Sequence, residues 1–266
     1  MTKRSFLRRP PRVAVIPLTG VISASQRGLG GGLSDQSLAA QIDRAFTKGK
    51  PNAVALLINS PGGSPAQSSL IGARIKRLSK EHKVPVYAFC EDVAASGGYW
   101  LACAAEEIFV DENSIVGSIG VISASFGFHE LLERNGVERR IHTAGGSKSF
   151  MDPFKPENPE DVIRLKALQE DIHQTFIAHV KTSRGDRLVE EDLFTGRVWV
   201  GQKSVEVGLA DGVGHLKPVM EDKLSAKPKF ILYGQRQSLL QKLGLKSALD
   251  LINPLEERAE WARYGL

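Results

Sequence analysis

The chain has 266 residues, 42% of them apolar and 24% charged, and a formal net charge of +5 with a pI near 9.2. This composition is ordinary for a soluble globular protein, and the length allows one large α/β domain or two small ones. No apolar run reaches the roughly 18 residues that a membrane span requires, and no motif that reads nucleic acid is present.

The N-terminal segment carries much of the positive charge, and residues 1–11 are interpreted as a basic stub. No apolar core follows these charges, and Pro10 and Pro11 interrupt the segment, so it does not resemble a signal peptide. We therefore expect a cytoplasmic protein. Its two cysteines, Cys90 and Cys103, lack metal-ligand spacing and are expected to be free, buried thiols.

Apolar runs typical of strands alternate with helix-like segments along the chain. This alternation predicts βαβ units and a largely parallel sheet. Strands are predicted at 12–18, 53–58, 84–89, 107–110 and 138–142, and helices at 38–46, 64–79, 99–105, 128–135, 158–184 and in the tail from 235.

A small-residue turn at Ser96 lies between a predicted strand and a predicted helix, with alanines before it and glycines after it. A hydroxyl on such a turn suits a nucleophile, because the side chain is exposed and a helix N-terminus lies close by. The simpler alternative is that Ser96 only caps the helix. A second glycine turn, Pro61-Gly-Gly63, could present main-chain amides to an oxyanion, or could be a plain connection.

A nucleophilic serine requires a base. None of the six histidines lies in a recognisable catalytic motif or is clearly tied to an aspartate, although a Ser-His-Asp triad stays open. Lys148 lies in a Gly- and Ser-rich loop; such a lysine is ordinarily a solvated charge, but a Ser-Lys pair is a known variant of the triad.

Several motifs occur together: Asn59-Ser-Pro-Gly-Gly63, Ala95-Ser-Gly-Gly-Tyr99, Gly117-Ser-Ile-Gly-Val121, Ser147-Lys148 and Thr195-Gly-Arg-Val-Trp-Val200. With this set the chain resembles the signal peptide peptidase A family, the S49 serine peptidases of the crotonase-like/Clp-type superfamily. The resemblance implies an α/β fold, a crotonase-like (Clp/crotonase) spiral of repeated ββα units. It would form a peptidase domain over 12–234, followed by a C-terminal helical extension over 235–266.

The resemblance also implies roles for individual residues. Ser96 matches the nucleophile, Lys148 the general base and Ser118 the serine that orients the lysine amine. The amides of Gly63 and Gly97 match the oxyanion hole, and no cofactor or metal is expected. Many family members carry a membrane anchor or signal, where this chain has only its basic stub.

The leading hypothesis is a serine endopeptidase that uses a Ser-Lys dyad on small, extended, apolar peptides or membrane-protein remnants. The alternatives are a crotonase-type acyl-CoA enzyme and a non-catalytic scaffold that binds membrane proteins. The expected partners are a peptide substrate and further copies of the chain in a homo-oligomeric ring, and no nucleic acid. The stub and the apolar and basic tail could also contact the inner membrane face, or the tail could pack on the core.

Overall fold

The computed structural model describes residues 10–24, 32–146, 148–189, 192–234 and 261–265, and its strands form one mostly parallel sheet. The strand order is β6-β5-β3-β2-β1-β8, and β4 pairs with β3 and β7. Every pairing is parallel except that of β5 with β6, which confirms the predicted sheet type. The strands are β1 (Arg12–Thr19), β2 (Ala53–Ser60), β3 (Val86–Ala95), β4 (Glu107–Val110), β5 (Ile115–Gly117), β6 (Val198–Val200), β7 (Gly212–Val213) and β8 (Lys229–Leu232).

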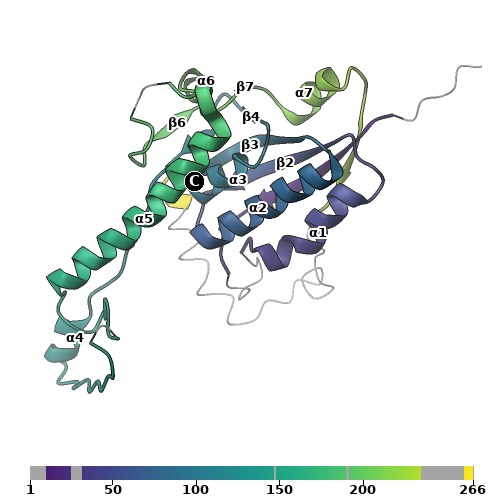
Figure 1. Ribbon diagram of the computed structural model, residues 1–266. Helices are drawn as coiled ribbons and strands as arrows, with labels where there is room; N and C mark the ends of the chain where they lie inside the picture. The colour runs from purple at the N-terminus through teal and green to yellow at the C-terminus, as the bar shows by residue number, and fades with distance from the viewer. Residues whose placement is uncertain (1–9, 25–31, 147, 190–191, 235–260, 266) are drawn as a thin grey trace, which may run out of the picture. The chain divides into compact units, whose positions relative to one another are not determined.

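Strands and helices alternate from β1 to β4, as predicted, whereas β4 and β5 follow each other directly, as do α4 and α5 (Figure 1). The first helix begins three residues before the predicted start at 38, because Ser34 and Ser37 form a reciprocal capping box. The second begins at Pro65 under a Ser64 cap, as predicted. The helices are α1 (Asp35–Thr47), α2 (Pro65–His82), α3 (Gly97–Ala102), α4 (His129–Arg134), α5 (Pro159–Arg184), α6 (Gln202–Glu206) and α7 (Leu216–Lys223), with a 3-10 turn η1 (Gly185–Arg187).

Both faces of the sheet bury apolar side chains. Helices α1 and α2 pack on one face through stripes that include Ile42 and Ile75 (Figure 1). On the other face, Met220 of α7 joins a cluster with Val15 and Phe89. Strands buried on both sides explain why the sequence shows continuous apolar runs without polar alternation. The two cysteines are free and buried, as predicted.

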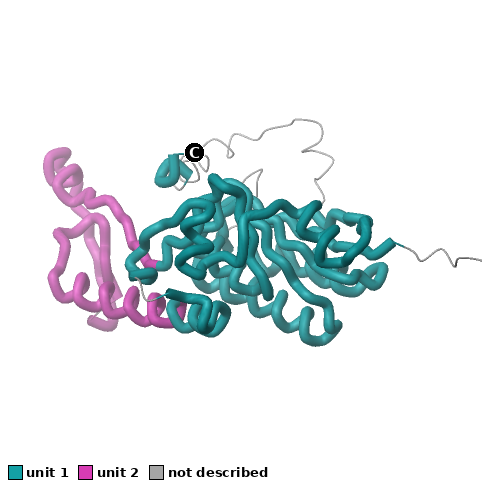
Figure 2. Tube along the Cα trace, turned by 90° about the horizontal axis from the view of Figure 1, so that it is seen from above, with its two compact units in different colours: residues 1–119, 177–266 teal, residues 120–176 magenta. Residues whose placement is uncertain are grey.

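The chain divides into two compact units (Figure 2). Unit 1 comprises residues 1–119 and 177–266 and contains the sheet; unit 2 comprises residues 120–176. No helix of the described residues is long and apolar enough to cross a membrane. Of the expected basic stub, residues 1–11, only residues 10 and 11 are described. Of the expected C-terminal extension, residues 235–266, only residues 261–265 are described.

The predicted strand at 138–142 is wrong. These residues of unit 2 form no regular structure, and most of them are exposed. Their charged side chains pair locally: Arg140 binds Glu138 two residues away, and Arg139 binds Asp152. The segment contains one apolar residue in its interior, Ile141, so it has little apolar surface to bury by joining a sheet.

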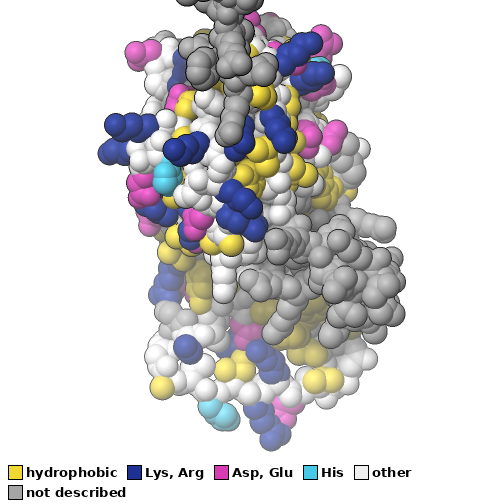
Figure 3. All heavy atoms as spheres, turned by 90° about the vertical axis from the view of Figure 1, so that its right-hand side faces the viewer, with side chains coloured by type: hydrophobic (Ala, Val, Ile, Leu, Met, Phe, Trp, Pro, Cys, Tyr) yellow, Lys and Arg dark blue, Asp and Glu magenta, His cyan; other side chains and the backbone are white. Residues whose placement is uncertain are grey.

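Charges of both signs are interspersed on the face of the molecule drawn in Figure 3. Lys and Arg side chains alternate there with Asp, Glu and apolar side chains, so the described residues of this face form no area of a single sign.

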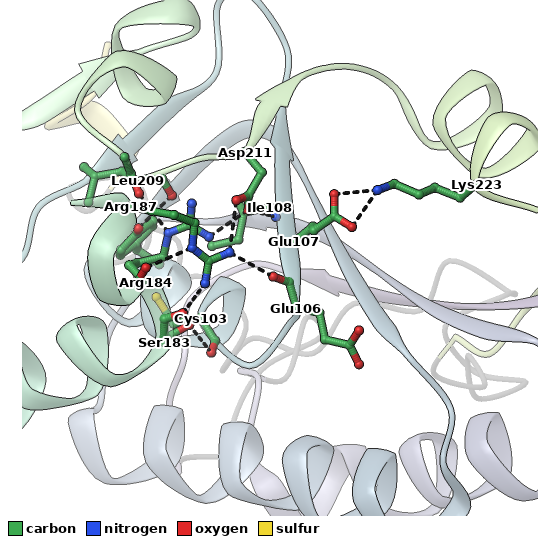
Figure 4. A network of polar contacts seen from close by, with 12 residues as sticks. Cys103, Glu106, Glu107, Ile108, Ser183, Arg184, Arg187, Leu209, Asp211 and Lys223 are labelled. Atoms are coloured by element: carbon green, nitrogen blue, oxygen red, sulfur yellow. Dashed lines mark hydrogen bonds and ion pairs between the residues drawn. The ribbon is translucent and has the colours of Figure 1, made fainter. Parts of the chain in front are cut away.

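A buried arginine joins the end of α5 to the loop before β7 (Figure 4). Arg184 donates from Nη1 to Asp211 Oδ2 at 2.7 Å and from Nε to the Gly208 carbonyl at 2.8 Å. Asp211 also accepts from Arg187 at 3.0 Å and from the Ile108 amide at 2.7 Å. Burial raises the pKa of Asp211, but these hydrogen bonds outweigh it and hold the pKa below its ordinary value.

We expect Asp211→Ala to lower the free energy of unfolding by about 3–5 kcal/mol, because it leaves the Arg184 guanidinium buried without its carboxylate. Urea unfolding measures this. Glu81→Ala is the control, because it removes an exposed pair with Arg77 and should cost less than about 1 kcal/mol. A carboxylate with a lowered folded pKa stabilises the fold fully above its unfolded pKa, so this contribution should begin to fall below about pH 4 and be lost as the pH drops through the lower folded pKa of Asp211. Equal losses in the two variants would contradict the assignment.

Candidate active site

Ser96 lies at a sharp turn between β3 and α3, as the sequence predicts. Its backbone has φ 51° and ψ −121°, a conformation that L-residues rarely adopt. The Ser96 amide donates to the Gly117 carbonyl at 2.8 Å, and its carbonyl accepts from the Trp100 amide at 3.0 Å. The side chain is half-buried and forms no capping hydrogen bond, although Ser96 occupies the N-cap position. The simple helix-cap interpretation therefore fails, and the hydroxyl is left for other chemistry.

Glycines are required around this turn because two main-chain segments meet there. Gly62 has φ 108°, and a Cβ at this residue would lie 2.8 Å from both the Gly97 nitrogen and the Ser96 Cβ. A Cβ at Gly98 would lie 2.5 Å from the Ser60 carbonyl oxygen. The loop after β2 therefore runs directly against the Ser96 turn, and larger residues would separate the two.

Two amides at this edge of the sheet are candidates for an oxyanion hole. Ile22 binds on both sides of Gly63: its amide donates to the Gly62 carbonyl at 2.7 Å, and its carbonyl accepts from the Ser64 amide at 2.8 Å. The Gly63 amide takes no part in this bridge. Gly97 is the first residue of α3, where a helix offers no acceptor of its own for the amide. Both residues lie at the carboxyl ends of the parallel neighbours β2 and β3.

Ser118 follows β5, a further parallel neighbour of β3. Because Ala95 pairs with Gly117, Ser118 and Ser96 extend from adjacent strand ends. Ser118 is 9% exposed, has φ 52°, and donates its amide to the Arg197 carbonyl at 2.7 Å. The structure thus brings four of the five predicted site residues to one edge of the unit 1 sheet.

The fifth residue, Lys148, belongs to unit 2. It is exposed, and its amide donates to the Gly145 carbonyl at 3.2 Å in a turn. The pairing of Lys148 with Ser96 stays a prediction.

Two histidines have partners that the sequence did not indicate. His215 Nε2 lies 2.9 Å from Asp111 Oδ2, an exposed pair that lowers the pKa of Asp111 to about 2. These residues are 104 positions apart, so no local motif could reveal them. His179 stacks on Trp100 at 4.2 Å between ring centroids, and burial lowers its pKa to about 4. Among the hydrogen bonds of the described residues, none joins either histidine to Ser96.

A second turn has the same backbone conformation as Ser96 but no side chain. Gly201, between β6 and α6, has φ 46° and ψ −121°, and its amide donates to the Ser114 carbonyl at 3.0 Å. A Cβ there would lie 2.0 Å from the Glu112 carbonyl oxygen. The fold therefore uses this strand-to-helix turn twice, and of the two positions only 96 has room for a side chain.

The model of Peptidase family S49 matches residues 78–227. The chain is 30% identical over 191 residues to a putative signal peptide peptidase SppA of Enterococcus faecium, covering 70% of this chain and 54% of that protein. It is 26% identical to the probable protease SohB of Haemophilus influenzae, covering 91% of this chain and 66% of that protein.

A further relative is longer and has a different name. The chain is 44% identical over 280 residues to a protein of Brucella abortus named Na(+)/H(+) antiporter NhaA, covering 99% of this chain. The chain spans 38% of the length of that relative.

Among solved structures, the membrane-bound stomatin-specific protease 1510-N in complex with a substrate peptide matches with a TM-score of 0.53 and 16% identity. The match covers 92% of this chain and 99% of that one. At this identity the likeness concerns the fold alone, and it supports the predicted crotonase-like (Clp/crotonase) class.

We expect Ser96→Gly to raise the free energy of unfolding by about 1 kcal/mol over Ser96→Ala, because glycine adopts the positive φ without strain. Urea unfolding of the two variants measures the difference. Ser225 is the matched control, because it is exposed, lies outside the site and also has a positive φ, 47°. Ser225→Gly should likewise be more stable than Ser225→Ala. A Ser96→Gly variant less stable than Ser96→Ala would show that the turn is not strained.

Proposed function

Because the chain belongs to peptidase family S49, we propose that it is a serine endopeptidase with Ser96 as nucleophile and Lys148 as general base. The observation that carries the proposal is the Ser96 turn itself. The Ser96 hydroxyl forms no capping hydrogen bond with α3, and two glycine amides lie at the same edge of the sheet. This combination is what acyl transfer requires: a nucleophile that solvent reaches in part, beside donors for a developing oxyanion.

In the proposed reaction, Ser96 Oγ attacks the carbonyl carbon of the scissile peptide while its proton passes to Lys148 Nζ. The amides of Gly63 and Gly97 donate to the oxyanion that forms. Lys148 then protonates the leaving amine, and water hydrolyses the acyl-enzyme. The lysine amine must be neutral to accept the first proton, and Ser118 is proposed to orient it by a hydrogen bond.

The proposed substrates are small, extended, apolar peptides or membrane-protein remnants. An extended chain suits this site, because Ser96 lies where the parallel strands β3 and β5 end and a peptide could continue their direction. The stomatin-specific protease with a similar fold was solved with a substrate peptide, which is consistent with a peptide-binding site on such a scaffold.

Two alternatives belong to other classes of function. A crotonase-type acyl-CoA enzyme would share the fold and the oxyanion hole, and a non-catalytic scaffold would only bind peptides. The family match favours the peptidase. Labelling by a fluorophosphonate separates the three, because only a peptidase with a nucleophilic serine should be modified at Ser96.

We expect Ser96→Ala and Lys148→Arg each to lower peptide hydrolysis by at least ~10³-fold, because one lacks the nucleophile and arginine stays protonated and cannot act as a base. Cleavage of a quenched fluorescent peptide measures the rate. Ser225→Ala and Lys166→Arg, both exposed, are the controls and should keep the wild-type rate. Near-normal turnover in Lys148→Arg would indicate a different base, and turnover in Ser96→Ala would refute the mechanism.

We also propose that the chain assembles into a homo-oligomeric ring. Unit 2 supports this, because it leaves many large apolar side chains in water, among them Phe126 at 80% and Ile163 at 69% exposure. A ring could shelter the active sites from folded proteins.

Light scattering on a size-exclusion column should give a mass several times 29.0 kDa. The double variant Phe126→Ser/Ile163→Ser should lower that mass, since both apolar contacts are lost. Leu70→Ser, at an equally apolar exposed residue of α2 in unit 1, should not. A wild-type monomer that hydrolyses peptide at full rate would refute the ring but not the Ser-Lys chemistry.

We further propose that the protein makes a peripheral contact with the inner membrane face. Its support is the basic charge of the N-terminal stub together with the apolar and basic tail, as in interfacial helices. Flotation with anionic liposomes at low salt tests it, and absence of binding would remove it.

A further inference from the structure

A pocket of about 750 Å³ lies in unit 1, away from the candidate active site. It is formed where α2 ends, where α3 has ended, and at the last turn of α5. The glycine loop of the site precedes the other end of α2, and an 18-residue helix is roughly 27 Å long. The pocket is therefore a separate feature that the proposed peptidase chemistry does not use.

The charged side chains that line this pocket are mostly positive. Lys76 and Lys80 come from the C-terminal turns of α2, Lys83 is the residue that caps its C-terminus, and Arg187 comes from η1. Residues four positions apart lie on one side of a helix, so Lys76 and Lys80 share a face, and Lys83 lines the same pocket from the helix end. Glu106 is the single acidic residue of the lining.

The carboxylate that pairs with Arg187 is already shared. Asp211 binds both Arg184 and Arg187, so it balances one guanidinium and not two (Figure 4). Arg187 also donates to the main-chain oxygen of Glu106 at 3.2 Å, which fixes its position in the wall. The ion pairs of the described residues include none of the three lysines.

Lys76 is half-buried in this positive surrounding. Burial lowers the pKa of its amine, and no carboxylate offsets that burial. A half-buried charge without a counter-ion costs free energy, and an anion in the pocket would recover it. Val84, Pro85 and Ala104 add an apolar part to the lining.

We propose that this pocket binds a small oligophosphate, a soluble molecule with two or more linked phosphate groups. Four cationic side chains against one carboxylate suit an anion of several charges better than a single dianion. Lysine and arginine are the side chains that bind phosphate, and the volume is within the range of small-molecule sites. The ligand class follows from charge and size together, and it is independent of the proposed peptidase activity.

Isothermal titration of the full chain with inorganic pyrophosphate and with ATP, both without divalent metal, tests the proposal. We expect saturable binding that weakens at least about tenfold in Lys80→Glu/Lys83→Glu, because the double substitution reverses two charges of the lining. Lys203→Glu, an exposed lysine of α6 outside the pocket, is the matched control and should bind within about twofold of wild type. Sulfate should bind at least about tenfold more weakly than pyrophosphate.

A second variant keeps the test independent of folding. Lys76→Met retains the apolar stem but removes the amine, so it should raise the Tm of the ligand-free protein while weakening pyrophosphate binding. Absence of saturable pyrophosphate and ATP binding to wild type would overturn the proposal, as would equal binding by the Lys80→Glu/Lys83→Glu variant. Binding to phosphatidylglycerol vesicles without binding of either soluble probe would also overturn it, because the source of phosphate would then be a lipid surface. None of these outcomes depends on peptide hydrolysis.

Discussion

The close contact between the Ser96 turn and the Pro61–Gly63 loop is the constraint on which the site depends. Ser96 can hold a positive φ only because its amide is fixed by the neighbouring strand β5 and its carbonyl by the first turn of α3. The loop can approach only because Gly62 has no side chain. These requirements place the Ser96 hydroxyl and two glycine amides at the carboxyl edge of one sheet. The surrounding main-chain hydrogen bonds hold the strained backbone conformation of Ser96.

Buried hydrogen bonds connect α3, the helix that follows the Ser96 turn, to the loop before β7. Tyr99 of α3 donates its hydroxyl to the Leu209 carbonyl at 2.7 Å, and Arg184 donates to the adjacent Gly208 carbonyl. Gly208 itself has φ 81°, and a Cβ there would lie 1.8 Å from the Arg187 carbonyl oxygen. The end of α5, the loop before β7 and the Ser96 helix are thus connected through hydrogen bonds that tolerate little rearrangement.

The distribution of charge separates two regions of unit 1. The edge with Ser96, Ser118 and the glycine amides presents neutral donors, which suit an uncharged peptide and a transient oxyanion. The far end of α2 instead gathers three lysines in a pocket that also contains Arg187. The neutral amide donors and the lysines therefore lie at opposite ends of one helix.

Local signals in the sequence predicted strands β1 to β4 and helices α1 to α5, but not the later short strands or helices α6 and α7. The strand-like runs, the Ser64-Pro65 helix start and the Asn158-Pro159 start of α5 follow from capping chemistry and apolar runs, which act over a few residues. The positions of Ser96 and Gly63 follow from small residues at strand ends. Only the tertiary structure decided that Ser118 adjoins Ser96, that Asp211 holds Arg184, and that three lysines at the C-terminal end of α2 meet Arg187 at one pocket. These contacts join residues far apart in the chain, and strand register and helix packing bring them together, which no local pattern encodes.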